Sequence, residues 1–487
     1  MKIAEVSPEI IPYAKTGGLA DVAGTLPLYL EKAGQEISIF MPLYKSVRES
    51  GMDVRLTNIT FDIPVGNVVC TGHLWKGVLP GAKNIVVYFI QNDEYYDRDA
   101  LYGTESGDYP DNAERFIFLS RAVLEAIKKL ELSIDVIHCH DWQTALIPVY
   151  LKTLYAHEKI LSAMKTVLTI HNLAYQGLFQ REDMKLTGLD QSLFNPSQLE
   201  HWGKINFLKG GIVFSDILTT VSRQYAEEIK TVEFGCGLEG VLKEHENRLS
   251  GIINGVDYKQ WSPENDKFIS HEYNSGDLRG KALCKKHLRK LLNLPQSKAP
   301  LLGMISRLAE QKGVDLLIAI MDELMKRDLQ LVILGIGEEK YHQMLREAAS
   351  RYKEKLSANI MFDNQLAHQI EAGADIFLMP SKYEPCGLSQ MYSLKYGTIP
   401  VVRETGGLAD TIIDANDENL RNGTATGFTM KGYSAAELLF TIDRALELYK
   451  SRTKWNTLRK NAMKQDWSWN KSAREYVELF KSVLAKE

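Results

Sequence analysis

The sequence predicts an α/β protein built from two doubly wound domains, and three observations support this fold class. The chain has 487 residues, more than the roughly 250–300 over which a single hydrophobic core keeps growing, so two domains are expected. Short apolar runs alternate with amphipathic stretches in both halves, a pattern typical of βα units around a parallel sheet. Hydrophobic residues make up 45% and charged residues 25% of the chain, as in ordinary globular proteins.

In the first half, most of the predicted strands are apolar enough to be buried on both faces. Apolar residues at helical spacing mark the helices between them. We expect strands at Lys2–Ser7, Glu36–Pro42, Val86–Ile90, Asp135–Cys139, Thr166–Ile170 and Ile217–Val221, and helices at Leu19–Ala33 and Asn112–Leu130.

A looser, polar stretch over residues 256–298 includes a lysine-rich helical run and is expected to connect two domains, residues 1–255 and 299–487. Whether the last helix returns to the N-terminal domain is left open. The alternation of strands and helices restarts after this connection. We expect strands at Leu301–Ser306, Leu329–Leu334, Asn359–Phe362, Asp375–Pro380 and Thr398–Val402, and helices at Lys281–Leu292, Val314–Arg327, Glu338–Lys355 and Leu388–Lys395.

Charge and cysteine content narrow the class of protein. The formal net charge is -4, so no global basic field is available to bind nucleic acid. The five cysteines are scattered without a C-x-x-C pair, which fits a reducing compartment better than a disulfide framework or a zinc ribbon. Because no apolar run reaches the ~20 residues that span a bilayer and no signal peptide is recognisable, a cytoplasmic location without membrane partners is expected.

A six-residue repeat links the two halves, because T-G-G-L-A-D occurs at Thr16–Asp21 and again at Thr405–Asp410. Each copy could be an ordinary strand-to-helix turn. Adjacent glycines also let the backbone approach a ligand closely, and the start of a helix offers N–H groups to anions. We therefore expect ligand-binding loops, one in each domain.

Two further motifs follow predicted strands of the second half. Arg307 and Lys312 lie between a strand and a helix, where a guanidinium and an ammonium group are suited to binding a diphosphate. Glu384 precedes a proline, which disfavours helical backbone at Glu384, and its carboxylate could accept hydrogen bonds from sugar hydroxyls. The alternatives are surface cations in a solvated loop and a carboxylate that stabilises the start of a helix.

The run His138-Cys139-His140-Asp141 raises the question of a metal site. Side chains alternate along a strand, so His138 and His140 share one side while Cys139 points to the other, and only part of the set can converge. We therefore expect packed or hydrogen-bonded histidines and no metal. The G-x-G-x-x-G and P-loop fingerprints are absent, which disfavours a dehydrogenase or a P-loop ATPase, and no cofactor is expected.

Together these motifs resemble those of the bacterial glycogen synthase and plant starch synthase family. The resemblance rests on Lys15–Val22, Arg307 with Lys312, Glu384–Leu388 and Thr405–Asp410, and it extends through His138–Trp142, His171–Gly177 and Gly251–Asp257. It implies the GT-B fold, in which two Rossmann-like domains face an interdomain cleft. It also implies transfer of glucose, with retention, from a nucleotide sugar to the non-reducing end of an α-1,4-glucan such as glycogen.

The resemblance further implies roles for individual residues. It places Lys15, Asp21, His171, Arg307, Lys312 and Glu384 in the catalytic set, and Lys15, Gly17, Gly18, Asp141, Asn254, Thr405, Gly406 and Gly407 in the substrate-binding set. In this assignment Arg307 and Lys312 neutralise the leaving diphosphate, Glu384 holds glucose hydroxyls, and His171 positions the sugar. Many related transferases carry a second glutamate eight residues after the first, where this chain has Tyr392, a departure compatible with the synthase branch.

The expected donor is ADP-glucose in preference to UDP-glucose. Two alternatives to glucan synthesis are a related transferase that makes a small glucoside such as sucrose phosphate, and a glucan-binding protein that has lost catalysis. The presence of Lys15, Arg307, Lys312 and Glu384 argues against the second alternative.

Overall fold

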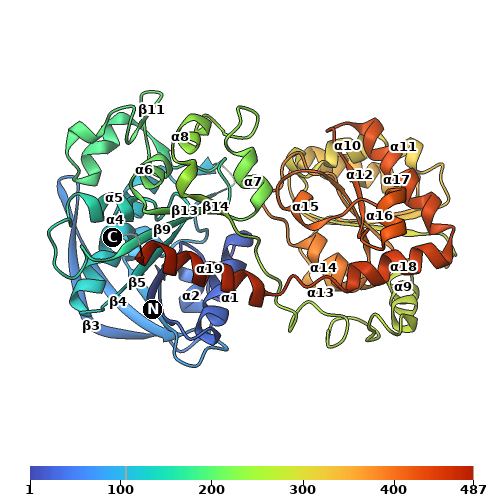
Figure 1. Cartoon of the computed structure of the whole chain (residues 1–487), viewed down its shortest axis with the longest axis horizontal. Helices are drawn as coiled ribbons and strands as arrows, with labels where there is room; N and C mark the ends of the chain where they lie inside the picture. The colour runs from blue at the N-terminus through green and yellow to red at the C-terminus, as the bar shows by residue number, and fades with distance from the viewer. Residues whose placement is uncertain (105–106, 486–487) are drawn as a thin grey trace. The chain divides into compact units, whose positions relative to one another are not determined.

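The computed structural model describes residues 1–104 and 107–485, which form two compact units (Figure 1). The first unit comprises Met1–Gly255 with Trp469–Glu487, and the second comprises Val256–Ser468. The first segment ends where the sequence places the end of the N-terminal domain. The last helix, whose location the sequence left open, belongs to the first unit.

Residues 256–298, expected as a connection, instead pack as part of the second unit. The ring of Trp261 stacks on His368 and Tyr392, with centroids 3.7 and 4.0 Å apart. The hydroxyl of Tyr273 donates to the carbonyl oxygen of Tyr396 at 2.8 Å. Aromatic packing therefore makes this polar stretch part of a folded domain. It also gives Tyr392, the residue that departs from the wider transferase pattern, a packing role.

Among the described residues, the first unit is built around a nine-stranded sheet in the order β14-β13-β9-β8-β1-β2-β5-β4-β3. The strands from β14 to β5 are parallel, whereas β4 and β3 extend the sheet as an antiparallel hairpin that the sequence analysis did not anticipate. The strands are β1 (Lys2–Val6), β2 (Glu36–Pro42), β3 (Arg55–Val65), β4 (Val68–Val78), β5 (Val86–Gln91), β8 (Val136–His140), β9 (Lys165–Ile170), β13 (Ile217–Thr220) and β14 (Leu249–Gly251).

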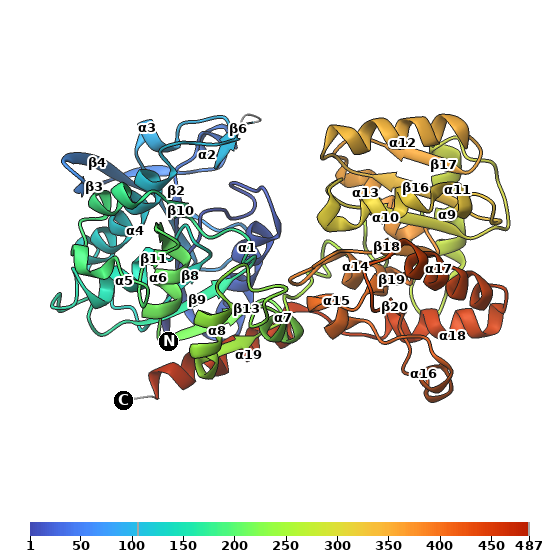
Figure 2. The same cartoon turned by 90° about the horizontal axis from the view of Figure 1, so that it is seen from above.

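Helices of the first unit bury apolar faces against this sheet, and the last of them closes the unit. Helix α19 packs on α1 and on β9, and it lies among the N-terminal elements in both views (Figures 1 and 2). The helices are α1 (Gly18–Lys32), α2 (Lys45–Glu49), α3 (Asp93–Tyr96), α4 (Asn112–Lys129), α5 (Leu146–Lys152), α6 (Phe207–Phe214), α7 (Arg223–Glu228), α8 (Glu239–Glu244) and α19 (Trp469–Leu484). Shorter elements are β6 (Gly103–Thr104), β7 (Gly107–Asp108), β10 (Leu178–Phe179), β11 (Glu200–His201), β12 (Lys204–Asn206), η1 (Arg181–Thr187), η2 (Gln191–Leu193) and η3 (Glu246–Arg248).

The second unit has a parallel sheet in the order β17-β16-β15-β18-β19-β20. One predicted strand, Asn359–Phe362, is displaced, because the strand observed is Leu356–Asn359. Leu356 is buried and pairs with Leu331, whereas the side chain of Phe362 is 82% exposed. The strands are β15 (Leu301–Ile305), β16 (Gln330–Leu334), β17 (Leu356–Asn359), β18 (Ile376–Met379), β19 (Ile399–Arg403) and β20 (Phe428–Met430).

Helices surround this second sheet, and α17 and α18 pack beside β19 and β20 (Figure 2). The helix predicted over Val314–Arg327 is divided at Ile320 into two shorter ones. The helical elements are α9 (Arg279–Leu291), η4 (Glu310–Lys312), α10 (Val314–Ala319), α11 (Met321–Leu324), α12 (Glu339–Arg351), α13 (Asn364–Gly373), α14 (Ser389–Tyr396), α15 (Gly406–Thr411), α16 (Asp417–Asn422), α17 (Ala435–Tyr449) and α18 (Arg452–Met463). None of the helices in the described parts of the chain is long and apolar enough to cross a membrane.

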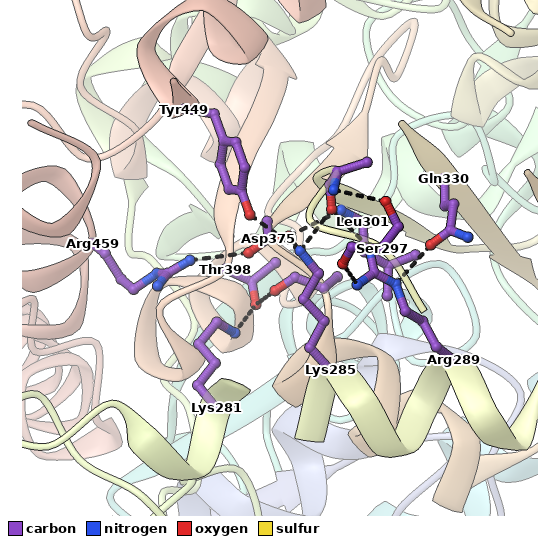
Figure 3. A network of polar contacts seen from close by, with 12 residues as sticks. Lys281, Lys285, Arg289, Ser297, Leu301, Gln330, Asp375, Thr398, Tyr449 and Arg459 are labelled. Atoms are coloured by element: carbon purple, nitrogen blue, oxygen red, sulfur yellow. Dashed lines mark hydrogen bonds and ion pairs between the residues drawn. The ribbon is translucent and has the colours of Figure 1, made fainter. Parts of the chain in front are cut away.

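A buried ion network ties α9 and α18 to the start of the second sheet (Figure 3). Asp375, just before β18, accepts from Lys285 of α9 at 2.5 Å and from Arg459 of α18 at 3.1 Å. It also accepts from the backbone N–H of Leu301 at 2.9 Å. Lys281 donates to the carbonyl oxygen of Ala372 and to the hydroxyl of Thr398, at 3.0 and 2.7 Å. Burial lowers the pKa of Lys281 to about 7. These contacts explain why the lysine-rich run belongs to the second unit.

Candidate active site

In each unit the predicted site residues follow the carboxyl ends of neighbouring parallel strands, where doubly wound sheets bind ligands. In the first unit the glycine loop follows β1, Asp141 follows β8, His171 follows β9 and Asn254 follows β14. In the second unit Arg307 and Lys312 follow β15, Glu384 follows β18, and the Thr405–Gly407 turn follows β19. The strand order β15-β18-β19 makes these three loops neighbours.

A buried carboxylate that the sequence analysis missed holds the glycine loop of the first unit. One oxygen of Glu9 accepts from the backbone N–H groups of Thr16 and Gly17 at 2.5 and 3.1 Å, and the other accepts from the hydroxyl of Tyr102 at 3.0 Å. Nothing lies within 4 Å of a Cβ built on Gly17 or Gly18, so there is space beside the loop. No signal in the sequence distinguishes Glu9 from an ordinary loop acid, because its partners become visible only in the folded loop.

Lys15 and Asp21, both predicted catalytic residues, form an ion pair across this loop. Their Nζ and Oδ1 atoms are 2.7 Å apart, and the side chains are 48% and 27% exposed. Burial raises the pKa of Asp21, and the neighbouring ammonium of Lys15 partly opposes that rise. Asp21 is thus in a position to hold the Lys15 ammonium beside the open face of the loop.

Asp141 and His171 lie together at the ends of β8 and β9. Asp141 has a left-handed backbone with φ of 56°, a conformation that is uncommon for residues other than glycine. Its Oδ1 accepts from the backbone N–H of His171 at 2.7 Å. Burial raises the pKa of Asp141 to about 7, against the lowering effect of hydrogen bonds from the N–H groups of His171 and Asn172. Asp141 therefore fixes the backbone of His171, a contact that the expected acceptor role did not include.

Behind His171 lies a fully buried cluster of Glu5, His138 and His140. In the described part of the chain these three offer ligand atoms within 4.8 Å of one another, which raises the metal question again. The histidines share one side of β8, as strand alternation predicts, and Cys139 is not in the group. A single oxygen of Glu5 lies 2.9 Å from Nδ1 of His138 and 3.0 Å from Nε2 of His140, distances typical of hydrogen bonds.

Asn254 is buried near the end of the first unit's main segment, and its side-chain oxygen has no hydrogen-bond partner in the structure. The next residue, Gly255, packs so closely on Trp469 that a Cβ there would lie 2.4 Å from the Trp469 Cα. A buried acceptor without a partner is unfavourable and is relieved when a donor reaches it. This is compatible with the expected contact between Asn254 and a ligand, which stays a prediction.

In the second unit, Lys312 and Glu384 are brought together from loops 72 residues apart in the chain. The Lys312 Nζ lies 2.6 Å from the Glu384 Oε2, and the two side chains are 22% and 8% exposed. The same carboxylate oxygen accepts from the hydroxyl of Ser381 at 3.0 Å. Arg307 donates to the side-chain oxygen of Gln311 at 2.8 Å. A cation and a carboxylate thus stand side by side where one ligand could meet both.

The second copy of the repeated hexapeptide differs from the first in its surroundings. Gly406 has φ of 45°, and a Cβ built on it would lie 2.0 Å from the carbonyl oxygen of Glu384. A Cβ on Gly407 would lie 2.0 Å from the carbonyl oxygen of Cys386. Thr405 and both glycines are buried. In this copy the glycines therefore allow close packing against the Glu384 loop, whereas Gly17 and Gly18 border open space.

Comparison with known proteins matches both halves of the chain. Residues 2–244 match the family model of the starch synthase catalytic domain, and residues 290–462 match that of glycosyl transferases group 1. The glycogen synthase of Fervidobacterium nodosum is 47% identical over 490 residues, covering 100% of this chain and 99% of the relative. That of Geotalea daltonii is 48% identical over 488 residues, covering all of both chains.

Solved structures agree with these relatives. The catalytic domain of starch synthase IV from Arabidopsis thaliana, bound to ADP and acarbose, superposes with a TM-score of 0.90 at 33% identity, covering 99% of each chain. A sucrose-phosphate synthase from Thermosynechococcus elongatus shares the fold, with a TM-score of 0.60 at 16% identity and complete coverage of both chains.

Two parallel-sheet units with grouped cations, carboxylates and glycine turns at their carboxyl edges define a glycosyltransferase of the GT-B fold. Within that class, the chain belongs to the glycogen synthase and starch synthase family.

Proposed function

We propose that this glycosyltransferase moves glucose, with retention, from ADP-glucose to the non-reducing end of an α-1,4-glucan. The observation that carries the proposal is the Lys312–Glu384 pair, with its 2.6 Å separation, in the loops that follow neighbouring strands β15 and β18. The ammonium group suits a diphosphate and the carboxylate suits sugar hydroxyls, so the pair fits a sugar nucleotide. Full-length relatives named glycogen synthase support the same activity.

The chemistry demands that negative charge on the departing diphosphate be balanced while an oxocarbenium-like sugar forms. Arg307 and Lys312 are the cations we assign to that task, and Lys15 beside the open glycine loop is a third cation for the donor. In this proposal Glu384 and His171 hold the glucose, and the acceptor hydroxyl attacks on the face from which the diphosphate leaves. Neither a metal nor a cofactor is assigned a role.

Adenine is proposed over uracil because the starch synthase that this chain resembles at 33% identity was solved with ADP bound. We also propose that the reaction takes place in the cytoplasm. All five cysteines are free thiols, a state that a reducing compartment maintains.

A donor and acceptor comparison tests the proposal. The full chain is incubated with glycogen and equal concentrations of radiolabelled ADP-glucose or UDP-glucose, and label is counted in precipitated glucan. We expect label in glucan with a higher kcat/KM for ADP-glucose. A hexose phosphate in place of glycogen is the control acceptor and should receive no label. A preference for UDP-glucose would contradict the donor assignment, and transfer to the hexose phosphate in place of glycogen would contradict the glucan synthase assignment.

A further inference from the structure

A chain of hydrogen-bonded side chains runs from the interior of the first unit to His171. Glu5 of β1 pairs in register with His138 of β8, so the two strands place the carboxylate beside the histidines. The Glu5 Oε2 lies 3.0 Å from the His140 Nε2, and the His140 Nδ1 lies 2.9 Å from the His171 Nε2. Glu5 and His140 are 1% and 0% exposed, whereas His171 is 9% exposed. His171 is therefore the end of the chain that a ligand could reach.

The charges of these groups determine which nitrogen carries each proton. Burial opposes ionisation of Glu5, but contacts with His138 and His140 outweigh it and lower the pKa of Glu5 to about 2. Burial lowers the pKa of His140 to about 4 and holds that of His171 well below its ordinary value. Near neutral pH, Glu5 is then a carboxylate that only accepts, and each ring is neutral with one N–H and one lone pair.

These constraints leave one arrangement of protons between Glu5 and His171. His140 must carry its proton on Nε2 to donate to Glu5, so its Nδ1 has the lone pair. That lone pair accepts from Nε2–H of His171, which leaves Nδ1 of His171 unprotonated. The tautomer of His171 is thus set by a carboxylate that it does not touch.

We propose that Glu5 and His140 are positioning residues that hold His171 as the Nε2–H tautomer, so that its Nδ1 accepts a hydrogen bond from a hydroxyl of the bound sugar. The inference rests on the proposed function for the identity of the sugar donor, but the tautomer itself belongs to the free protein. Asp141 fixes the backbone of the same residue, so both the backbone and the ring of His171 are held.

The C-terminal helix takes part in this arrangement. Tyr476 and Phe480 of α19 pack on the ring of His138, with centroids 5.5 and 5.4 Å away. The other ring nitrogen of His138, Nε2, lies 2.6 Å from the hydroxyl oxygen of Thr169. The second histidine at Glu5 is thereby enclosed by apolar and polar contacts, and this low-dielectric setting strengthens the hydrogen bonds to the carboxylate.

The substitution that tests the proposal is Glu5→Gln, because an amide can donate as well as accept. A donating amide next to the His140 Nε2 allows His140 to carry its proton on Nδ1 and to donate toward His171. The ring of His171 would then shift its own proton to Nδ1 and lose the acceptor. The matched control is Glu371→Gln, at another fully buried glutamate, whose pKa burial raises to about 8, so that it is already neutral near pH 7.

The readout is nitrogen-15 NMR of the histidine rings in the full chain without substrate, with His171 assigned by its loss in His171→Asn. We expect wild type and Glu371→Gln to show an unprotonated Nδ1 on His171, and Glu5→Gln to show its loss or a mixture. Glucose transfer by Glu5→Gln should fall about 10- to 100-fold in kcat, as for other residues that orient a functional histidine, with little change in KM for glucan. Should Glu5→Gln fail to fold, His140→Gln tests the same link by the same spectrum.

Three outcomes would overturn the inference. They are an Nδ1–H tautomer of His171 in wild type, an unchanged tautomer and kcat in Glu5→Gln, or stoichiometric zinc in the purified protein that Glu5→Gln abolishes. If wild type transfers no glucose to any acceptor, the proposed function fails, whereas the spectrum of free His171 still decides the tautomer.

Discussion

Alanine at Arg307 or at Lys312 is expected to lower kcat by about 30- to 1,000-fold, a loss of transition-state stabilisation of about 2–4 kcal/mol. Each cation is expected to meet charge that develops on the diphosphate, so turnover should fall by more than glucan binding. Lys312→Ala should be the more harmful, because it also leaves the 8%-exposed Glu384 carboxylate without its cation. Steady-state kinetics with glycogen and ADP-glucose measure both effects.

Lys326→Ala is the matched control, because Lys326 is a 68%-exposed surface lysine paired with Glu323 and should not affect kcat. Activity of wild type should also persist in excess EDTA, since the proposal assigns the charge-balancing role to these side chains. Wild-type kcat in both Ala variants would contradict that assignment. So would loss of activity on chelation that magnesium restores.

Asp375→Ala is expected to destabilise the second unit by about 3–5 kcal/mol, the range found when one partner of a buried ion pair is removed. Asp375 is 7% exposed and accepts from Lys285, Arg459 and the backbone N–H of Leu301. Its loss leaves buried cations and an N–H group without their acceptor (Figure 3). Urea unfolding of the full chain measures the change in the free energy of unfolding.

Asp322→Ala provides the comparison for that experiment. Asp322 pairs with Arg351 at 2.7 Å but is 64% exposed, and exposed ion pairs contribute only about 0–1 kcal/mol. Equal effects of the two substitutions would show that the network around Asp375 does not anchor α9 and α18 as the structure indicates.

Sequence patterns predicted the fold well where a single strong period dominates. The apolar runs at the centres of both sheets are buried on both faces, and their order along the chain implies parallel pairing. The β3–β4 hairpin was missed because its residues alternate between buried and exposed without a continuous apolar run. The strand near Asn359 was displaced because Met361 and Phe362 are apolar yet exposed, so hydrophobicity alone gave the wrong register.

The candidate site was predictable only to the level of which loops carry it. Arg307, Lys312 and Glu384 stand out in the sequence, but the Lys312–Glu384 contact depends on β15 and β18 being neighbours, which the sequence does not reveal. The histidines of β8 were considered with Cys139 and Asp141 of the same segment. Their partner Glu5 lies 133 residues before His138 and is brought to it by strand pairing.

The repeated hexapeptide illustrates the same limit from the other direction. Identical residues at Thr16–Asp21 and Thr405–Asp410 begin helices in both units, as the pattern predicts. Gly17 and Gly18 border open space, whereas Gly406 and Gly407 pack on the backbone of Glu384 and Cys386. Local sequence determines the turn, while the fold around it determines whether a ligand has room beside the glycines.

The central claim, retaining glucose transfer to the non-reducing end of an α-1,4-glucan, is tested most directly by following the anomeric carbon. The full chain is incubated with ADP-glucose labelled with carbon-13 at C1 and a maltooligosaccharide, and the product is analysed by carbon-13 NMR before and after β-amylase. We predict label in a new α-1,4 linkage that β-amylase releases as labelled maltose, because that enzyme acts from the non-reducing end. Label in a β-linkage, in another linkage position, or only in free glucose would contradict the account.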